Sequence, residues 1–306
     1  MAVVLHPNSR MSPAGATWIS RRGVDLAYVG TCLLFLVAPF ERLQPLVSLP
    51  GQKVTTVEAA VLLVAAGWCA VCAVSRPWPA CRTPIALPLD AWLGVATIAT
   101  ALAQAFQLNA LKTLGRLGLG WFVVLLPFNG VTSPARMTRV VWCATASAVV
   151  VAIVATLESM GVPVVMRWLE DFRQGVRVVG GQVRAGGTLQ YPTIASMYLE
   201  IVFALALGAF LHAMDRRSMT GAADMFVALA IIAAGIAVTL TRSGLITMAF
   251  SLAAVGAARF ARRGWDRGAV GLGALSVAVV LVVTSAASAQ CGSAGVLLRR
   301  RHAGGR

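Results

Sequence analysis

Charged side chains are scarce in this chain of 306 residues, where only 12% of positions hold Asp, Glu, Lys or Arg. Soluble globular proteins carry about 25% charged residues, so the composition excludes a protein whose whole surface faces water. Hydrophobic residues make up 58% of the chain. The sequence therefore predicts an all-α fold, a polytopic bundle of transmembrane helices.

Metal-binding residue types are also few, with three histidines and six cysteines. Cys69 and Cys72 have C-x-x-C spacing, but no second pair and no nearby histidine completes a metal site. The glycine-rich stretch 115–121 lacks a P-loop lysine and is typical of close helix packing. We expect no metal and no cofactor.

Acidic residues number 11 against 26 basic ones, which gives a net charge of +15. The basic residues fall in short clusters between apolar segments, as the loop charges of membrane proteins do. Lysine occurs only at Lys53 and Lys112, so nearly all of this charge is arginine. The pattern predicts a membrane environment and no nucleic-acid partner.

The apolar runs suffice for about nine membrane-spanning helices, each of which needs roughly 20 residues. Asp90, Gln104 and Gln107 weaken the third run, and Pro127 and Asn129 interrupt the fourth. No internal repeat of fixed period is present. The candidate spans are 24–40, 54–74, 86–107, 117–135, 138–157, 193–212, 222–240, 244–260 and 268–288.

The distribution of arginine predicts the orientation of these spans. With a cytoplasmic N-terminal segment, 1–23, the arginine-rich short loops collect on the cytoplasmic side, as the positive-inside rule requires. The membrane region is then 24–290, the long loop 158–192 lies outside, and a basic tail follows at 291–306. Arg242 falls on the outer side.

The long outer loop has two parts. Residues 163–179 begin with proline and place apolar side chains on one helical face, which predicts a helix in the outer interface. Residues 180–192 are expected to form a flexible glycine-rich turn that carries Arg184; the alternative is a plain surface linker. The apolar face consists of Val165, Trp168, Leu169, Phe172, Val176 and Val179.

Two stretches carry a family resemblance. RAGGTLQYPTIASMYLE, 184–200, is similar to a Gly-Thr-Phe-x-x-Pro-Asn stretch that opens a membrane helix, and TLTRSGLI, 239–246, to a Thr-x-Ser-Arg-Gly stretch. Together they resemble the O-antigen ligase family and its O-antigen polymerase relatives over residues 25–290. The order Thr-Arg-Ser-Gly and the presence of Thr193 in place of asparagine depart from that pattern.

The resemblance implies a metal-independent, inverting glycosyltransferase of lipopolysaccharide biosynthesis in the bacterial inner membrane. Such an enzyme takes a glycan from undecaprenyl diphosphate and passes it to a sugar hydroxyl, on lipid A–core for a ligase or on a growing glycan for a polymerase. Ligase and polymerase remain open alternatives, and a non-catalytic transporter or flippase subunit is a third.

We expect the diphosphate of this donor to bind Arg242 and Arg184, with Thr241 and Ser243 beside them. Guanidinium groups offer two parallel donors to phosphate oxygens, and the N–H groups at a helix start favour anions. In the alternative, Arg242 anchors the helix at the interface while Thr241 and Ser243 cap it.

Glu200 lies eight residues beyond Pro192, about 12 Å along a helix. A carboxylate at membrane depth is a functional candidate, either as a base or as the partner of an arginine. No catalytic residue is assigned, and Glu200 is the candidate that the sequence offers.

The family continues into a large periplasmic domain with a further arginine and a catalytic histidine. This sequence ends in SAQCGSAGVLLRRRHAGGR, where His302 lacks the family's His-Asn context, and His6 and His212 fall on the cytoplasmic side. We therefore expect a C-terminally truncated member that inserts into the membrane without transferring glycan, and a tail, 291–306, that need not be native.

Overall fold

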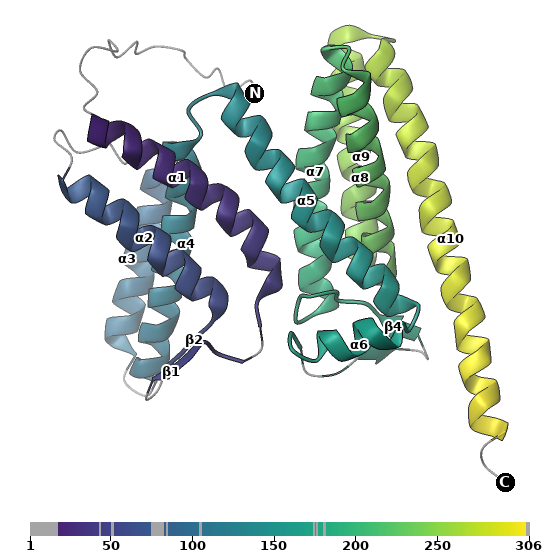
Figure 1. The fold of residues 1–306 in the computed structure, drawn as a ribbon, viewed down its shortest axis with the longest axis horizontal. Coiled ribbons are helices and arrows are strands. Elements are labelled where there is room, and N and C mark those ends of the chain that lie inside the picture. Colours follow the sequence, from purple (N-terminus) through teal and green to yellow (C-terminus); the bar gives the residue numbers. More distant parts are fainter. Residues whose placement is uncertain are drawn as a thin grey trace. The chain divides into compact units, whose positions relative to one another are not determined.

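The computed structural model (Figure 1) describes residues 18–303 apart from 43, 50–51, 75–82, 84, 104–105, 174, 176 and 180–181. In this part of the chain there are ten α-helices, one short 3-10 helix and two small antiparallel hairpins. The elements are α1 (Trp18–Val37), η1 (Ala38–Phe40), β1 (Val47–Leu49), β2 (Gln52–Val54), α2 (Thr56–Val74), α3 (Ala86–Leu102), α4 (Gln107–Gly130), α5 (Pro134–Ser159), α6 (Pro163–Leu169), β3 (Arg177–Val179), β4 (Gln182–Arg184), α7 (Pro192–Asp215), α8 (Met219–Val238), α9 (Arg242–Arg263) and α10 (Arg267–Ala303).

The expected membrane architecture is confirmed. Seven stretches of the described residues are long and apolar enough to cross a membrane, namely Gly23–Phe40, Gln107–Gly130, Pro134–Ser159, Pro192–Asp215, Met219–Val238, Arg242–Arg263 and Arg267–Ser285. Two shorter apolar helices, Thr56–Val71 and Ala86–Leu102, occupy the second and third predicted spans. The chain is thus a multi-pass, all-α integral membrane protein.

Several boundaries differ from the sequence-based expectation, and the last span, expected at 268–288, is exceeded by α10, which continues to Ala303. The fourth span was expected at 117–135, but α4 starts at Gln107 and ends at Gly130, with Pro127 in its last turn. The predicted interfacial helix, 163–179, is also shorter, since α6 ends at Leu169 and β3 occupies Arg177–Val179. Gly175 has a φ of +74°, a left-handed conformation that interrupts a right-handed helix.

The predicted apolar face of that segment is confirmed in part. Leu169 and Phe172 are buried, and the ring of Phe172 lies 4.8 Å from that of Trp168, centroid to centroid. Val176 lies outside the described residues, as do His6 and the rest of 1–17 of the expected cytoplasmic segment. Two residues of the predicted apolar face are therefore buried in the fold.

Contacts divide the chain into two compact units. The first consists of Met1–Thr31 and Ala60–Arg136, and among its described residues Trp68 packs edge-on against Phe122, with ring centroids 5.7 Å apart. Gly130 in this unit packs directly against the backbone of α1 at Tyr28.

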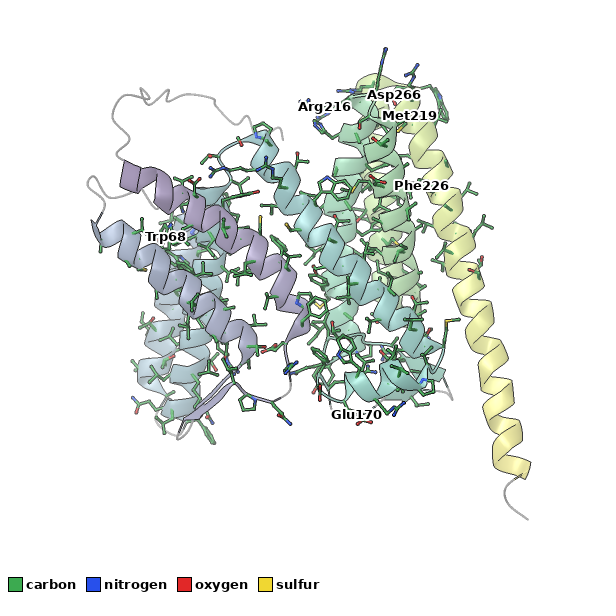
Figure 2. The ribbon with its side chains drawn as sticks, viewed as in Figure 1. Trp68, Glu170, Arg216, Met219, Phe226 and Asp266 are labelled. Atoms are coloured by element: carbon green, nitrogen blue, oxygen red, sulfur yellow. The ribbon has the colours of Figure 1, made fainter. Side chains whose placement is uncertain are left out.

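The second unit consists of Cys32–Ala59 and Met137–Arg306. Its core lies among α5, α7, α8 and α10, where Phe203, Leu229 and Leu275 are fully buried. Close packing depends on small residues: a Cβ at Gly235 would lie 2.5 Å from that of Ala152 on α5. Figure 2 shows that α7 and α8 run between an end near Glu170 and an opposite end near Arg216, Met219 and Asp266.

Candidate functional site

A buried ion pair lies at the end of the second unit where α6 and β4 are found (Figure 1). Glu158, in the last turn of α5, has an exposed fraction of 0%, and Arg173, beyond α6, is 5% exposed. Arg173 Nη2 and Glu158 Oε1 form the pair. Burial of two charges is costly unless they are paired and hydrogen-bonded, so this pair constrains how the loop can fold.

The second carboxylate oxygen of Glu158 holds the glycine-rich turn. Its Oε2 atom accepts hydrogen bonds from the backbone N–H groups of Gly186, at 3.1 Å, and Gly187, at 2.9 Å. Thr188 next to them is buried, and its hydroxyl donates to the carbonyl of Pro39 at 2.6 Å. The expectation of a flexible turn, or of a plain surface linker, is therefore wrong for Gly186–Thr188.

Arg184 joins the two stretches that carried the family resemblance. Its Nε–H donates to the carbonyl of Thr239 at 3.2 Å, and its Nη2–H donates to the hydroxyl of Thr241 at 3.3 Å. The backbone reinforces this junction, because the N–H of Ala185 donates to the carbonyl of Val238 at 3.1 Å. Two segments more than fifty residues apart in the chain thus form one polar cluster.

The turn between α8 and α9 is strained at this junction. Leu240 has a φ of +52°, which is uncommon for a residue with a branched side chain and costs of order 1–3 kcal/mol. Strained backbone is concentrated at functional sites. The strain here orients the Thr239 carbonyl and the Thr241 hydroxyl, both of which meet Arg184.

The start of α9 presents Arg242 and Ser243, which are both exposed. Thr241 occupies the N-cap position, but its hydroxyl makes no capping hydrogen bond and donates to the Thr239 carbonyl at 3.4 Å. Within the described part of the chain, Arg242 forms no hydrogen bond or ion pair. Its guanidinium group is therefore available to a ligand.

Glu200 faces the same helix start from α7. The hydroxyl of Ser196 donates to Glu200 Oε1 at 2.6 Å. A Cβ at Gly244 would collide with the Ser196 hydroxyl and would lie 2.9 Å from Glu200 Oε1. Gly244 thus allows α9 to approach this carboxylate, whose partner is a serine rather than the arginine that we considered.

Arg184, Thr241, Arg242 and Ser243 thus lie at one junction, with Glu200 packed against the first turn of α9. Sequence reasoning missed the Glu158–Arg173 pair, although a glutamate at the end of an otherwise apolar run was a visible signal. His212, in contrast, lies in the last turn of α7, at the opposite end of that helix. The described residues contain no group of three or more metal-ligating side chains.

The chemistry of this junction suits an anion. A guanidinium group has five N–H donors, and Arg184 uses only two of its nitrogens for the turn. The N–H groups in the first turn of α9 add partial positive charge. The chain matches no protein-family model, no curated protein and no solved structure.

Proposed function

We propose that this membrane protein binds the diphosphate of a lipid-linked glycan at the Arg184–Arg242 junction. The observation that carries this proposal is the pair of hydrogen bonds from Arg184 to Thr239 and Thr241. They attach one arginine to the turn from which a second, Arg242, projects. The donor is an undecaprenyl-diphosphate-linked glycan, and the membrane is the bacterial inner membrane, with this junction on the periplasmic side.

Two arginines match the charge of a diphosphate. Arg242 is exposed and supplies a planar fork of donors, which favours bidentate contact with phosphate oxygens. Arg184 is half-buried and already oriented, so little side-chain entropy is lost when it binds. Ser243 adds a hydroxyl donor on the same helix turn.

The reaction that uses this donor in the O-antigen ligases and polymerases that the two stretches resemble is glycosyl transfer. The expectation of a chain without transfer activity rests on the missing family histidine, so transfer by this chain requires another base. An acceptor hydroxyl oxygen forms a bond to the anomeric carbon, the bond from that carbon to the diphosphate oxygen breaks, and a base takes the hydroxyl proton. Glu200, held by Ser196 against the start of α9, is the candidate base among the residues of this junction. The acceptor is lipid A–core in a ligase and a second glycan in a polymerase.

Donor binding is tested with the purified full chain in detergent and undecaprenyl diphosphate as the probe. Charged hydrogen bonds contribute about 1.5–3 kcal/mol, so Arg242→Ala should weaken binding by about 10–150-fold. Arg242→Lys should weaken it less, because a point charge replaces the fork. The matched control is Arg167→Ala, which removes an exposed arginine from α6 at the same end.

If the Arg242→Ala variant and the Arg167→Ala control bind undecaprenyl diphosphate equally well, Arg242 serves only as an interfacial anchor and the proposal is wrong. Transfer is read separately as polymer-capped lipopolysaccharide in a ligase-deficient strain. A capped product identifies a ligase, whereas longer uncapped glycan identifies a polymerase.

A further inference from the structure

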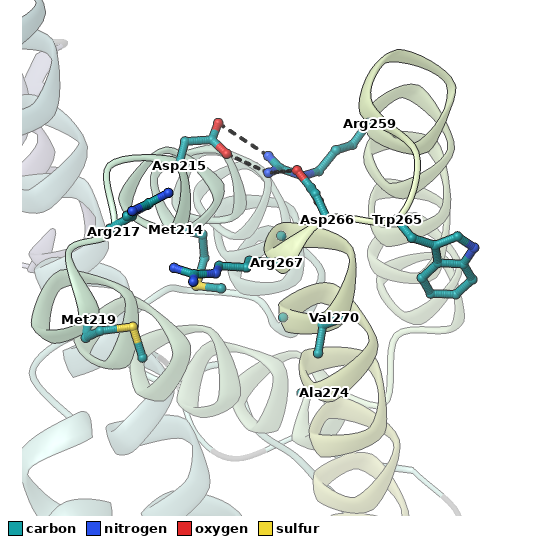
Figure 3. Close-up of a pocket in the computed structure, with 12 residues that line it drawn as sticks. Met214, Asp215, Arg217, Met219, Arg259, Trp265, Asp266, Arg267, Val270 and Ala274 are labelled. Atoms are coloured by element: carbon teal, nitrogen blue, oxygen red, sulfur yellow. Dashed lines mark hydrogen bonds and ion pairs between the residues drawn. The ribbon is translucent and has the colours of Figure 1, made fainter.

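A second site lies at the opposite end of α7–α10, away from the proposed diphosphate junction. A cavity of about 940 Å³ opens there between the α7–α8 turn and the start of α10. Figure 3 shows Arg267 extending from α10 toward Met214, with Arg217 on the other side of the opening. The cavity thus combines charged and apolar walls.

The carboxylates of this cavity are already neutralised. Arg259 donates from Nη2 to Asp215 Oδ1 at 2.5 Å and to Asp266 Oδ2 at 2.6 Å, and from Nε to Asp266 Oδ1 at 3.1 Å. Arg263 Nη1 adds a second ion pair to Asp215 at 2.9 Å. Two arginines therefore balance two aspartates.

Arg217 and Arg267 remain without a carboxylate partner among the described residues, and both are exposed. They line the same cavity. Because the charges of Arg259 and Arg263 cancel those of the two aspartates, Arg217 and Arg267 leave a net charge of +2. Arg217 also has a φ of +57°, a left-handed conformation that is uncommon for arginine. The two arginines without a carboxylate partner therefore give this opening a positive charge, which favours an anionic ligand.

The apolar wall continues along one face of α10. Val270 and Ala274 line the cavity, and Val277 and Leu281 follow at helical spacing; the three larger side chains, Val270, Val277 and Leu281, are all more than half exposed. From 270 to 281 this stripe measures about 16 Å at 1.5 Å per residue. That length is close to half the hydrocarbon thickness of a bilayer, about 15 Å.

We propose that the cavity binds the headgroup of an anionic phospholipid, with one acyl chain along the α10 stripe. Arg217 and Arg267 supply the donors for the headgroup phosphate, as basic pockets between membrane helices do. Trp265, at 82% exposure beside the cavity, has the side chain that favours the membrane–water interface. An apolar stripe joined to a cationic opening matches an amphiphile better than a free anion.

The test measures retention of phosphatidylglycerol against phosphatidylcholine by native mass spectrometry of the full chain. The variant combines Arg217→Asn, which tolerates the left-handed backbone, with Arg267→Gln. The control combines Arg216→Asn with Arg262→Gln, which removes the same charge from exposed arginines that do not line the cavity. Each cation near an anionic surface contributes about fivefold in affinity, so the variant should lose about 25-fold selectivity and the control less than about threefold.

Equal losses in variant and control would show general charge attraction and overturn the site. Equal retention of both lipids by the unchanged protein would do the same. Competition by inorganic phosphate or glycerol phosphate at the lipid's own concentration would identify a free-anion site and contradict the role of the α10 stripe. A Leu281→Asn variant that keeps full selectivity would also contradict that role.

Discussion

Replacement of Glu158 by glutamine should test how strongly the buried ion pair holds the loop between α5 and α7. The amide oxygen of glutamine can still accept the N–H groups of Gly186 and Gly187, so the substitution removes the charge with little change in shape. It leaves Arg173, whose side chain is only 4% exposed, as a buried charge without its partner. Removal of one partner from a buried pair costs about 3–5 kcal/mol.

The loss can be measured as a fall in melting temperature of the purified protein in detergent. For a domain of this size, each kcal/mol lost from the free energy of unfolding lowers the melting temperature by about 2–4 °C. The melting temperature of Glu158→Gln should therefore be about 6–20 °C lower. The double variant Glu158→Gln, Arg173→Met should recover most of that loss, because it removes the stranded charge and keeps an apolar side chain. Glu170→Gln, an exposed position in the same loop, should change stability by no more than about 0.5 kcal/mol.

A single variant within about 1 kcal/mol of the unchanged protein would refute this reasoning, since the buried guanidinium would then have found another partner or water. A double variant no more stable than Glu158→Gln alone would also refute it, because the loss would then come from shape and not from charge.

Three further results are expected. Gly187→Ala should lower the free energy of unfolding by about 1–2 kcal/mol, because its φ of +57° disfavours a Cβ that would also lie 3.0 Å from a carbonyl of α5; thermal unfolding checks this. Gly130→Ala should destabilise by about 1–3 kcal/mol through collision with the α1 backbone, whereas Gly208→Ala, with open space around it, should not destabilise α7 in the same assay. The hydrogen bond from Arg259, followed by that from the Ala269 N–H, lowers the pKa of Asp266. Its stabilising contribution is therefore present above about pH 4 and is lost as the pH falls below that value; unfolding of Asp266→Asn at a series of pH values should show a deficit at pH 7 that disappears in acid.

The membrane class and the approximate positions of the apolar helices could be read from the sequence, because they depend on local hydropathy, but among the described residues only seven of the nine expected spans are long enough to cross a membrane. A run of about 20 apolar residues is sufficient to predict a membrane-spanning helix wherever its neighbours lie. The neighbouring glycine, serine and threonine residues were also enough to single out Arg184 and Arg242 as candidate binding residues. The prediction that they bind diphosphate is a separate matter and stays a prediction.

Short-range signals were less reliable inside the long loop. The apolar spacing of 163–179 is that of one helix, but α6 ends at Leu169. Gly175 and the pairing of β3 with β4 exclude a helix from the later part of the segment. The side chains of Leu169 and Phe172 are nevertheless buried, and the ring of Phe172 packs against that of Trp168, so part of the apolar face is packed without a long helix.

Only the tertiary structure decided which polar groups meet. Arg184 contacts Thr239 and Thr241 across more than fifty residues, and Glu158 reaches both Arg173 and the Gly186–Gly187 turn. The sequence lists these donors and acceptors but not their partners, because each pairing depends on how α5, α7 and α8 pack. Once that packing excludes water, an unpaired charge or N–H is costly, and this penalty selects the one arrangement of the loop in which each of them has a partner.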